Sequence, residues 1–347
     1  MKLRAPSSLA FLVFCFACGS LPRAVASENC GYPLSLNKSG FEIGEQPPTA
    51  VLPSNSTPLS LSVAFPPDGA VLGTPSIQVY GTYSGPPNTG ISVNGEYPAI
   101  QDAASFTTQL IALSPGANPL SIVLTSQDGT SQTVTRTVQY NPSLVPDVSL
   151  IGFTSGDYAP KRIGFKLTTH VPAGQSAISL IEIDFNGDGN FEITTTDAGA
   201  PLAFDFTSPS VSLARARVTF DDGNSGTSPV VSESTFRVQM SALAYARESL
   251  CNLYYTMKHR LQAQDISGAL NTVLTQDRAD WQSAWQGLGV NLSTAANGLG
   301  EVVSGRISSS SADFVVATPD TEHPGDYAGF PLQFKRESTG VWRISEM

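Results

Sequence analysis

The sequence predicts a mainly β protein in which two antiparallel β-sandwiches are followed by a small α+β domain. Between residues 58 and 240, short runs of alternating apolar and polar residues are separated by turns rich in glycine, proline, asparagine and aspartate. After residue 241, apolar residues recur at steps of three and four, which indicates a helix, before the alternation returns. A chain of 347 residues with 30 glycines and 25 prolines is long enough for two or three such domains.

The N-terminal residues resemble an export signal. Two basic residues precede the apolar run 9–17, and residues 24–26 (Ala-Val-Ala) have the small-x-small form of a signal-peptidase site. We therefore expect residues 1–26 to be a cleaved signal peptide, because the apolar run is too short to span a bilayer as a helix. The stretch around Cys18 resembles a bacterial lipoprotein box, so lipidation of Cys18 is the alternative to cleavage after Ala26.

Two cysteines, Cys30 and Cys251, would remain after cleavage, in a compartment where thiols oxidise. A disulfide between them would close a very long loop, and two unpaired buried thiols are the alternative. The net charge of −10, with no cluster of lysine and arginine, argues against a nucleic-acid partner. The sequence contains no phosphate-binding loop, nucleophile elbow, zinc pair or dinucleotide fingerprint.

Residues 27–57 lack a periodic pattern and are expected to be an extended linker. The first sandwich is predicted over residues 58–140, with alternating runs at 59–63, 76–80, 90–93, 105–111, 120–124 and 133–138. Turns are expected at 66–69, 94–95, 115–118 and 128–130. The stretches 65–71, 79–95 and 113–118 together resemble the bacterial immunoglobulin-like module called glucodextranase domain B. That resemblance implies an accessory module of secreted or surface proteins, with no catalytic residue of its own.

A second sandwich is predicted over residues 147–240, after a linker at 141–147. Its stretches 183–189 and 218–224, in which a strand ends in an Asp-Gly turn, together resemble the polycystic kidney disease (PKD) type of immunoglobulin-like domain. The fold class predicted for the whole chain is therefore two tandem immunoglobulin-like β-sandwiches followed by an α+β domain.

The C-terminal segment 241–347 is expected to begin with a helix over 243–261. Asp265 and Asp277 are expected to cap a second and a third helix. Four strands are predicted to follow, at 301–307, 312–317, 327–335 and 341–345. This order resembles the cystatin-like cone of the nuclear transport factor two-like superfamily, which implies either a ligand pocket or an assembly module.

The densest cluster of candidate metal ligands lies in residues 181–192. Five oxygen donors of the kind calcium prefers occupy alternate positions: Asp184, Asn186, Asp188, Asn190 and Glu192. Aligned with an EF-hand, this segment has Thr195 where the bidentate glutamate should be, and its flanks predict strands in place of helices. We therefore expect a β-turn calcium site completed by Asp221 or Asp222. The alternative is a polar hairpin turn exposed to solvent.

These features predict an exported, non-enzymatic binding or structural protein of the bacterial periplasm or cell surface, with an unknown protein or glycan partner. No cofactor is expected unless calcium binds. One alternative is a carbohydrate-recognition accessory protein that uses Tyr80, Tyr83 and Tyr97. Another is an enzyme with a C-terminal pocket that uses His259, Asp280 or Glu301. No spacing in the sequence indicates a catalytic base beside a substrate.

Overall fold

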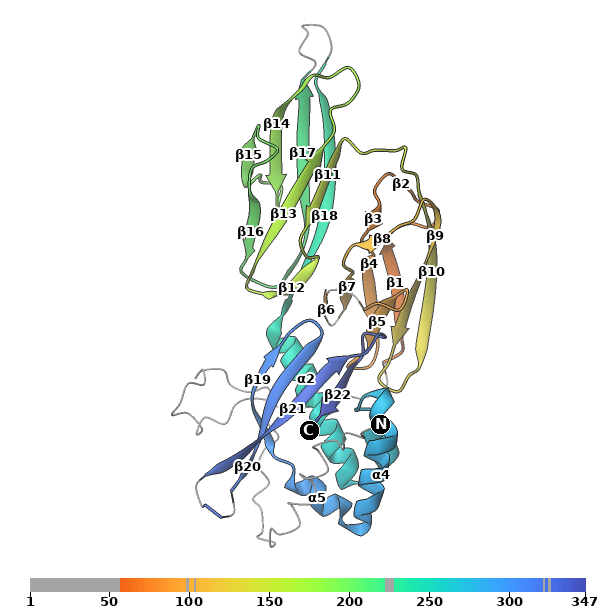
Figure 1. Cartoon of the computed structure of the whole chain (residues 1–347), viewed down its shortest axis with the longest axis vertical. Coiled ribbons are helices and arrows are strands. Elements are labelled where there is room, and N and C mark those ends of the chain that lie inside the picture. The colour runs from red at the N-terminus through yellow and green to blue at the C-terminus, as the bar shows by residue number, and fades with distance from the viewer. Residues whose placement is uncertain (1–56, 98–99, 103, 222–227, 321, 324–325) are drawn as a thin grey trace, which may run out of the picture.

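The computed structural model describes residues 57–97, 100–102, 104–221, 228–320, 322–323 and 326–347 (Figure 1). It shows two β-sandwiches followed by a domain of helices and one sheet, which confirms the predicted fold class. The signal peptide, Cys18, Cys30 and the linker up to residue 56 lie outside the described residues. No helix within the described ranges is both long enough and apolar enough to cross a membrane.

The first sandwich packs two four-stranded sheets, ordered β1-β4-β7-β6 and β2-β10-β9-β5, around one hydrophobic core. Its strands are β1 (Ser60–Phe65), β2 (Val71–Leu72), β3 (Ser76–Ile77), β4 (Tyr80–Ser84), β5 (Gly90–Val93), β6 (Ile100–Gln101), β7 (Ser105–Thr107), β8 (Ile111–Ala112), β9 (Gly116–Thr125) and β10 (Ser131–Tyr140). Two predicted runs are each interrupted, since 76–80 divides into β3 and β4 and 105–111 into β7 and β8. The turn predicted at 115–118 is wrong, because Gly116 already pairs with Tyr140 at the start of β9.

The second sandwich packs a sheet ordered β11-β13-β16 against one ordered β12-β18-β17-β14-β15. Its strands are β11 (Val148–Gly152), β12 (Gly156–Ala159), β13 (Lys161–Thr169), β14 (Ala177–Asp184), β15 (Ile193–Thr195), β16 (Leu202–Phe206), β17 (Ser210–Asp221) and β18 (Val230–Ala242). Alternate residues of β17 and β18 face the core, as the period-two pattern predicts.

The C-terminal domain packs its helices against one face of the antiparallel sheet β19-β20-β21-β22. Its main elements are α2 (Leu243–Gln262), α3 (Ile266–Leu270), α4 (Arg278–Leu288), α5 (Leu292–Gly298), β19 (Glu301–Ile307), β20 (Ser311–Pro319), β21 (Tyr327–Arg336) and β22 (Trp342–Glu346), with 3-10 turns η2 (Thr275–Asp277) and η3 (Gly289–Asn291). Asp265 caps α3 by accepting a hydrogen bond from the Gly268 N–H. Asp277 makes no such side-chain bond, because the chain enters α4 directly from η2.

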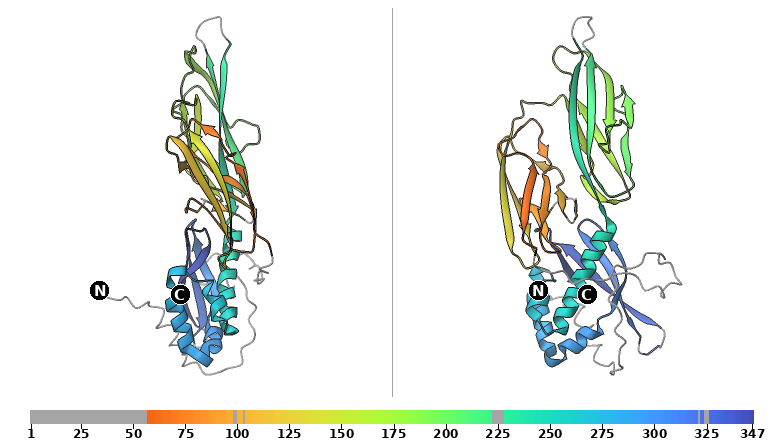
Figure 2. Two further views of the ribbon diagram at one scale, coloured as in Figure 1. Left: turned by 90° about the vertical axis from the view of Figure 1, so that its right-hand side faces the viewer. Right: turned by 180° about the vertical axis from the view of Figure 1, so that it is seen from behind.

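The three domains lie against one another. The first sandwich stands beside the second sandwich and also reaches the C-terminal domain (Figure 2). The second sandwich and the C-terminal domain are joined without a linker, because β18 ends at Ala242 and α2 begins at Leu243. The arrangement of the domains therefore depends on this one joint and on the contacts that the first sandwich makes on either side of it.

Candidate metal centre and interdomain junctions

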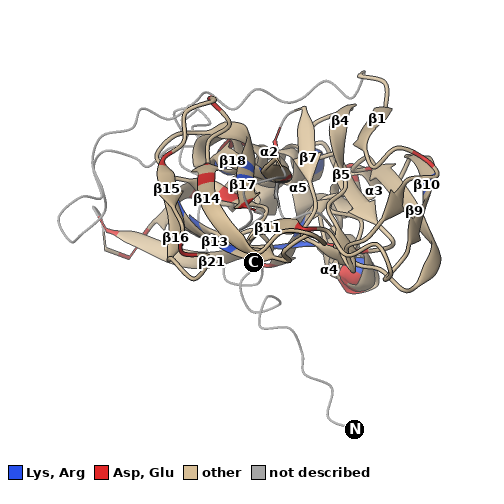
Figure 3. Cartoon of the chain, turned by 90° about the horizontal axis from the view of Figure 1, so that it is seen from above, with Lys and Arg blue, Asp and Glu red and all other residues tan. Residues whose placement is uncertain are grey.

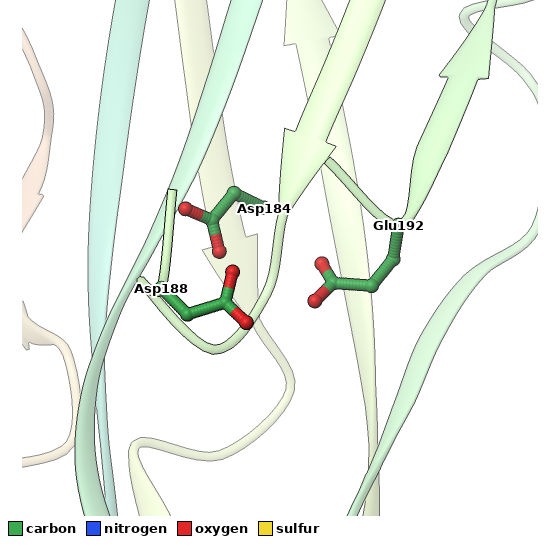
Figure 4. A group of neighbouring side chains, drawn as sticks. All are labelled: Asp184, Asp188 and Glu192. Carbon is green, nitrogen blue, oxygen red and sulfur yellow. The ribbon is translucent and has the colours of Figure 1, made fainter. Parts of the chain in front are cut away.

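The acidic loop between β14 and β15 brings three carboxylates together. One oxygen from each of Asp184, Asp188 and Glu192 lies within 4.8 Å of the others (Figure 4). Asp184 is buried at the end of β14, whereas Asp188 and Glu192 are exposed. Asn186 donates its side-chain amide to Asp188 at 3.1 Å, and the backbone N–H of Asn190 donates to Asp188 at 2.7 Å. Three of the five predicted ligands therefore converge, and the two asparagines bond to one of them.

The backbone of the loop is fixed by the same carboxylates. Asp184 accepts hydrogen bonds from the N–H groups of Gly187 (2.6 Å) and Gly189 (2.9 Å), and Glu192 accepts one from Phe185 (2.7 Å). Both glycines have positive φ, and a Cβ on Gly187 would lie 3.0 Å from the Leu213 carbonyl oxygen. The loop is therefore folded tightly onto β17, and Gly187 is needed both for its backbone conformation and for this close approach.

The charges around the loop favour a cation. The N–H of Asn190, followed by the Asn186 amide, lowers the pKa of Asp188, so this carboxylate stays ionised at neutral pH. The nearby arginines are already paired, Arg215 with Glu233 and Arg217 with Glu182 at 2.6 Å. In Figure 3 the acidic and basic positions on β14, β17 and β18 lie side by side. None of the three loop carboxylates forms an ion pair with any lysine or arginine that the structure describes.

The prediction that Asp221 completes this site is wrong. In the antiparallel pairing of β14 with β17, Asp221 lies opposite Ala177, whereas Asp184 at the other end of β14 lies opposite Arg215. Asp221 and Asp184 are therefore at opposite ends of the strand pair. Asp222 lies outside the described residues.

The tyrosines predicted for a carbohydrate-binding face are used inside the molecule. Tyr80 stacks on Phe65 with ring centres 5.2 Å apart, and the guanidinium of Arg237 from the second sandwich lies 4.5 Å from its ring centre. Tyr83 is buried and donates to the Asp102 carbonyl. Tyr97 lies under a guanidinium from the C-terminal domain.

The residues considered for a C-terminal enzyme lie on three different elements, His259 on α2, Asp280 on α4 and Glu301 on β19. Glu301 accepts hydrogen bonds from Lys258 at 3.0 Å and from Tyr255. Burial, with the bond to Glu301, raises the pKa of Tyr255 far above its usual range, so its hydroxyl remains a donor. Asp280 lies in the first turn of α4. His259 lies on α2, directly after Lys258. Cys251 is fully buried on α2, and pairing with Cys30 remains a prediction.

Sequence reasoning missed the polar junction between the two sandwiches. The side-chain amide of Gln78, in the break between β3 and β4, donates to the Arg237 carbonyl at 2.8 Å, and its oxygen accepts from the Arg237 N–H at 2.9 Å. Gln78 therefore pairs with β18 as a neighbouring strand would. Its amide also donates to Ser155 at 2.8 Å. These contacts explain why the predicted run 76–80 is interrupted at Gln78.

A second carboxamide completes this junction. Gln239 on β18 has no exposed surface; its oxygen accepts from the Thr107 hydroxyl at 2.9 Å. Its amide donates to the Asp102 carboxylate at 3.2 Å and to the Ser105 carbonyl at 3.1 Å. Because every one of these partners belongs to the first sandwich, the side-chain bonds of Gln239 within the protein form only when the two sandwiches are docked.

The first sandwich meets the C-terminal domain in a similar way. The Asn88 side chain exchanges two hydrogen bonds with the Trp342 backbone, at 2.9 and 3.0 Å, and so covers part of the edge of β22. Gly90 and Gly340 let the two backbones touch, since a Cβ on Gly90 would lie 2.3 Å from the Val341 nitrogen. Arg343 donates to the Gln127 carbonyl at 2.8 Å.

Comparisons with known proteins leave the function open. No protein-family model matches the chain, and no curated protein matches it. Among solved structures, the chain is similar to dimeric latent PorU from Porphyromonas gingivalis (14% identity, TM-score 0.27), covering 55% of this chain and 20% of the PorU chain. It is also similar to fibronectin(III)-like modules of Clostridium thermocellum CbhA (13% identity, TM-score 0.18; 52% and 94% covered) and to murine CEACAM1b (12% identity, TM-score 0.18; 54% and 100% covered). The three specific family resemblances of the domains stay predictions.

Proposed function

We propose that the protein is an exported, non-enzymatic structural protein of the bacterial periplasm or cell surface, whose three domains act as one rigid body. The observation that carries this proposal is the use of side-chain carboxamides, the buried Gln78 and Gln239 and the half-buried Asn88, to bond one domain to the backbone or side chains of another. Such bonds have strict geometry, so they fix orientation as well as contact. The leader predicted at residues 1–26 supports export.

Other features favour this proposal over the alternatives. The aromatic side chains that a glycan-binding face would need are packed against Phe65, Arg237 and Arg336. Glu301, one of the candidate catalytic residues, is engaged by Lys258. A structural role requires neither a free aromatic face nor a reactive group.

Calorimetry of the mature chain, residues 27–347, tests the rigid body. Domains that unfold together give one transition whose calorimetric and van't Hoff enthalpies agree, whereas independent domains give two or three. Separated transitions for the sandwiches would contradict the proposal. Export is tested by expressing residues 1–347 in a Gram-negative host, where we expect a periplasmic product beginning at Ser27. An intact, cytoplasmic product would refute it.

We also propose that the acidic loop of the second sandwich binds calcium, because Asp184, Asp188 and Glu192 converge and none of them forms an ion pair with a lysine or arginine among the described residues. A ligand present at a hundred times its dissociation constant stabilises the folded state by about 2.7 kcal/mol. We expect calcium to raise the unfolding temperature relative to chelator, and Asp188→Asn to abolish the rise. Asp205→Asn, an exposed aspartate on β16, is the matched control and should keep it. If the wild-type protein unfolds at the same temperature in calcium and in chelator, the loop is a polar hairpin that binds no calcium.

A further inference from the structure

The second sandwich and the C-terminal domain meet at a joint between β18 and α2, with no linker residues between these elements. Ala242 ends β18 with an extended backbone (φ −74°, ψ 127°), and helical residues follow at once. A rotation about these few bonds would move the two domains relative to each other. The angle of the joint therefore depends on contacts made across it.

A short hairpin of the first sandwich makes such contacts on both sides of the joint. We call residues 100–102 and 104–107, which include β6 and β7, the bridging hairpin. Gln101 accepts a hydrogen bond from Arg336 of the C-terminal domain at 2.7 Å. The next residue, Asp102, accepts one from Gln239 of the second sandwich at 3.2 Å. Figure 1 shows β6 and β7 beside β12 and the start of α2, at the place where the three domains meet.

The bridging hairpin is itself held in shape. The Asp102 carboxylate accepts from the N–H groups of Ala104 at 3.0 Å and Ser105 at 2.8 Å. The Gln101 amide donates to the Thr89 carbonyl at 2.7 Å, which ties the hairpin to the neighbouring sheet. The two groups that face different domains therefore cannot shift independently.

Arg336 is the residue of the C-terminal domain that binds the bridging hairpin. Its guanidinium is buried and donates to the carbonyls of Gly340 and Ser309, both at 3.2 Å, as well as to Gln101. The rings of Tyr97 and Trp342 lie 5.1 and 5.6 Å from it. No carboxylate among the described residues forms an ion pair with Arg336. Part of the compensation for burying this charge therefore comes from Gln101 and Tyr97 of the first sandwich.

We propose that the bridging hairpin locks the joint between β18 and α2, and that releasing its contacts lets the second sandwich swing relative to the C-terminal domain. This inference rests on the proposed rigid body and names the element that makes the body rigid. The first sandwich acts as a brace across the joint, since Gln101 and Asp102 bind domains on opposite sides of it.

Distance measurement by pulsed electron paramagnetic resonance tests this lock in the mature chain. Spin labels carried by unnatural amino acids replace Thr196 on the second sandwich and Lys335 on β21, both exposed. We expect one narrow distance distribution for the otherwise wild-type protein. In the double variant Arg336→Met/Gln239→Leu, which removes the hairpin's partners in both domains, the distribution should widen. The bonds of Gln78 and Asn88, which this variant keeps, limit the widening.

The controls separate the two proposals. Gln132→Leu/Arg136→Met makes the same exchanges on β10 of the first sandwich, away from the joint, and should leave the distribution narrow. A broad distribution in the wild type would refute the rigid body itself. A narrow wild type with an equally narrow double variant would refute the lock alone. If the double variant does not fold, the single variant Gln101→Leu, which removes one side of the bridge, replaces it with the same expected broadening.

Discussion

Replacing Gln239 by leucine should lower the free energy of unfolding by about 3 kcal/mol. Leucine has nearly the same size and fills the same buried space, but it cannot make the bonds to Thr107, Ser105 and Asp102. Two neutral hydrogen bonds contribute about 1 kcal/mol each, and one to a carboxylate contributes about 1.5 to 3 kcal/mol. The greater apolarity of leucine and the partners' remaining bonds, such as that from Arg237 to Thr107, offset part of this sum.

Urea unfolding followed by circular dichroism measures this change, and calorimetry should show an unfolding temperature lower by about 4–5 °C if the mature chain unfolds as one unit. Gln132→Leu on the exposed side of β10 is the control, because its side chain makes no hydrogen bond described in the structure. A loss below about 0.5 kcal/mol, within the range of ordinary surface substitutions, would refute the view that the junction stabilises the fold.

Two further substitutions test other parts of the junctions. Gly90→Ala should destabilise the docking of the first sandwich on β22, since the new Cβ would meet the Val341 nitrogen at 2.3 Å; Gly287→Ala, with open space and a helical backbone, should be neutral or stabilising by about 1 kcal/mol. Glu337→Gln tests pH dependence. Burial alone raises the pKa of Glu337, but the Thr275 N–H and the Arg343 guanidinium outweigh it and leave the pKa lowered. Its contribution is full above the ordinary glutamate pKa and is lost as pH falls through the lowered value. Urea midpoints measured from pH 6 to 3 should therefore fall less steeply in Glu337→Gln, and parallel curves would contradict this.

The order and type of the elements could be predicted because each domain buries its own apolar face. Alternation over residues 120–124 and 133–138 indicates β9 and β10, and the three- and four-residue spacing over 243–261 indicates α2. The short helix α5, residues 292–298, was not predicted. It follows α4 and η3 without a break, and its N-cap residue, Asn291, makes no side-chain hydrogen bond to the helix. The predicted strand boundaries were wrong where a strand leaves its sheet to contact another domain.

The acidic loop could be found from sequence because its ligands are close along the chain. Carboxylates at alternate positions, separated by glycines, must lie near one another whatever the rest of the fold does. The completing ligand could not be chosen, because Asp221 depends on the register of β14 with β17. In the sequence, Asp184 looks like any other loop carboxylate, but the structure buries it under the loop that it also caps.

The junctions could not be found from sequence, because their signal is a polar residue in a strand. Gln78 between Ile77 and Val79, and Gln239 between Val238 and Met240, fit a solvent-facing position of a sandwich equally well. Local alternation shows which face of a strand is polar, but it does not show whether water or another domain covers that face. Only the pairing of residues more than 130 positions apart distinguishes the two cases.

The polarity of these junctions has a consequence for assembly. Gln78, Gln239 and Asn88 can bond to water when the domains are apart, so each sandwich can fold before docking without exposing a large apolar face. Docking then exchanges bonds to water for bonds of fixed geometry, which contributes modest stability and strong orientation. The same exchange covers the Trp342 backbone at the edge of β22, which would otherwise be open to pairing with another chain. Side-chain carboxamides therefore contribute both to the fixed orientation of the domains and to the protection of this sheet edge.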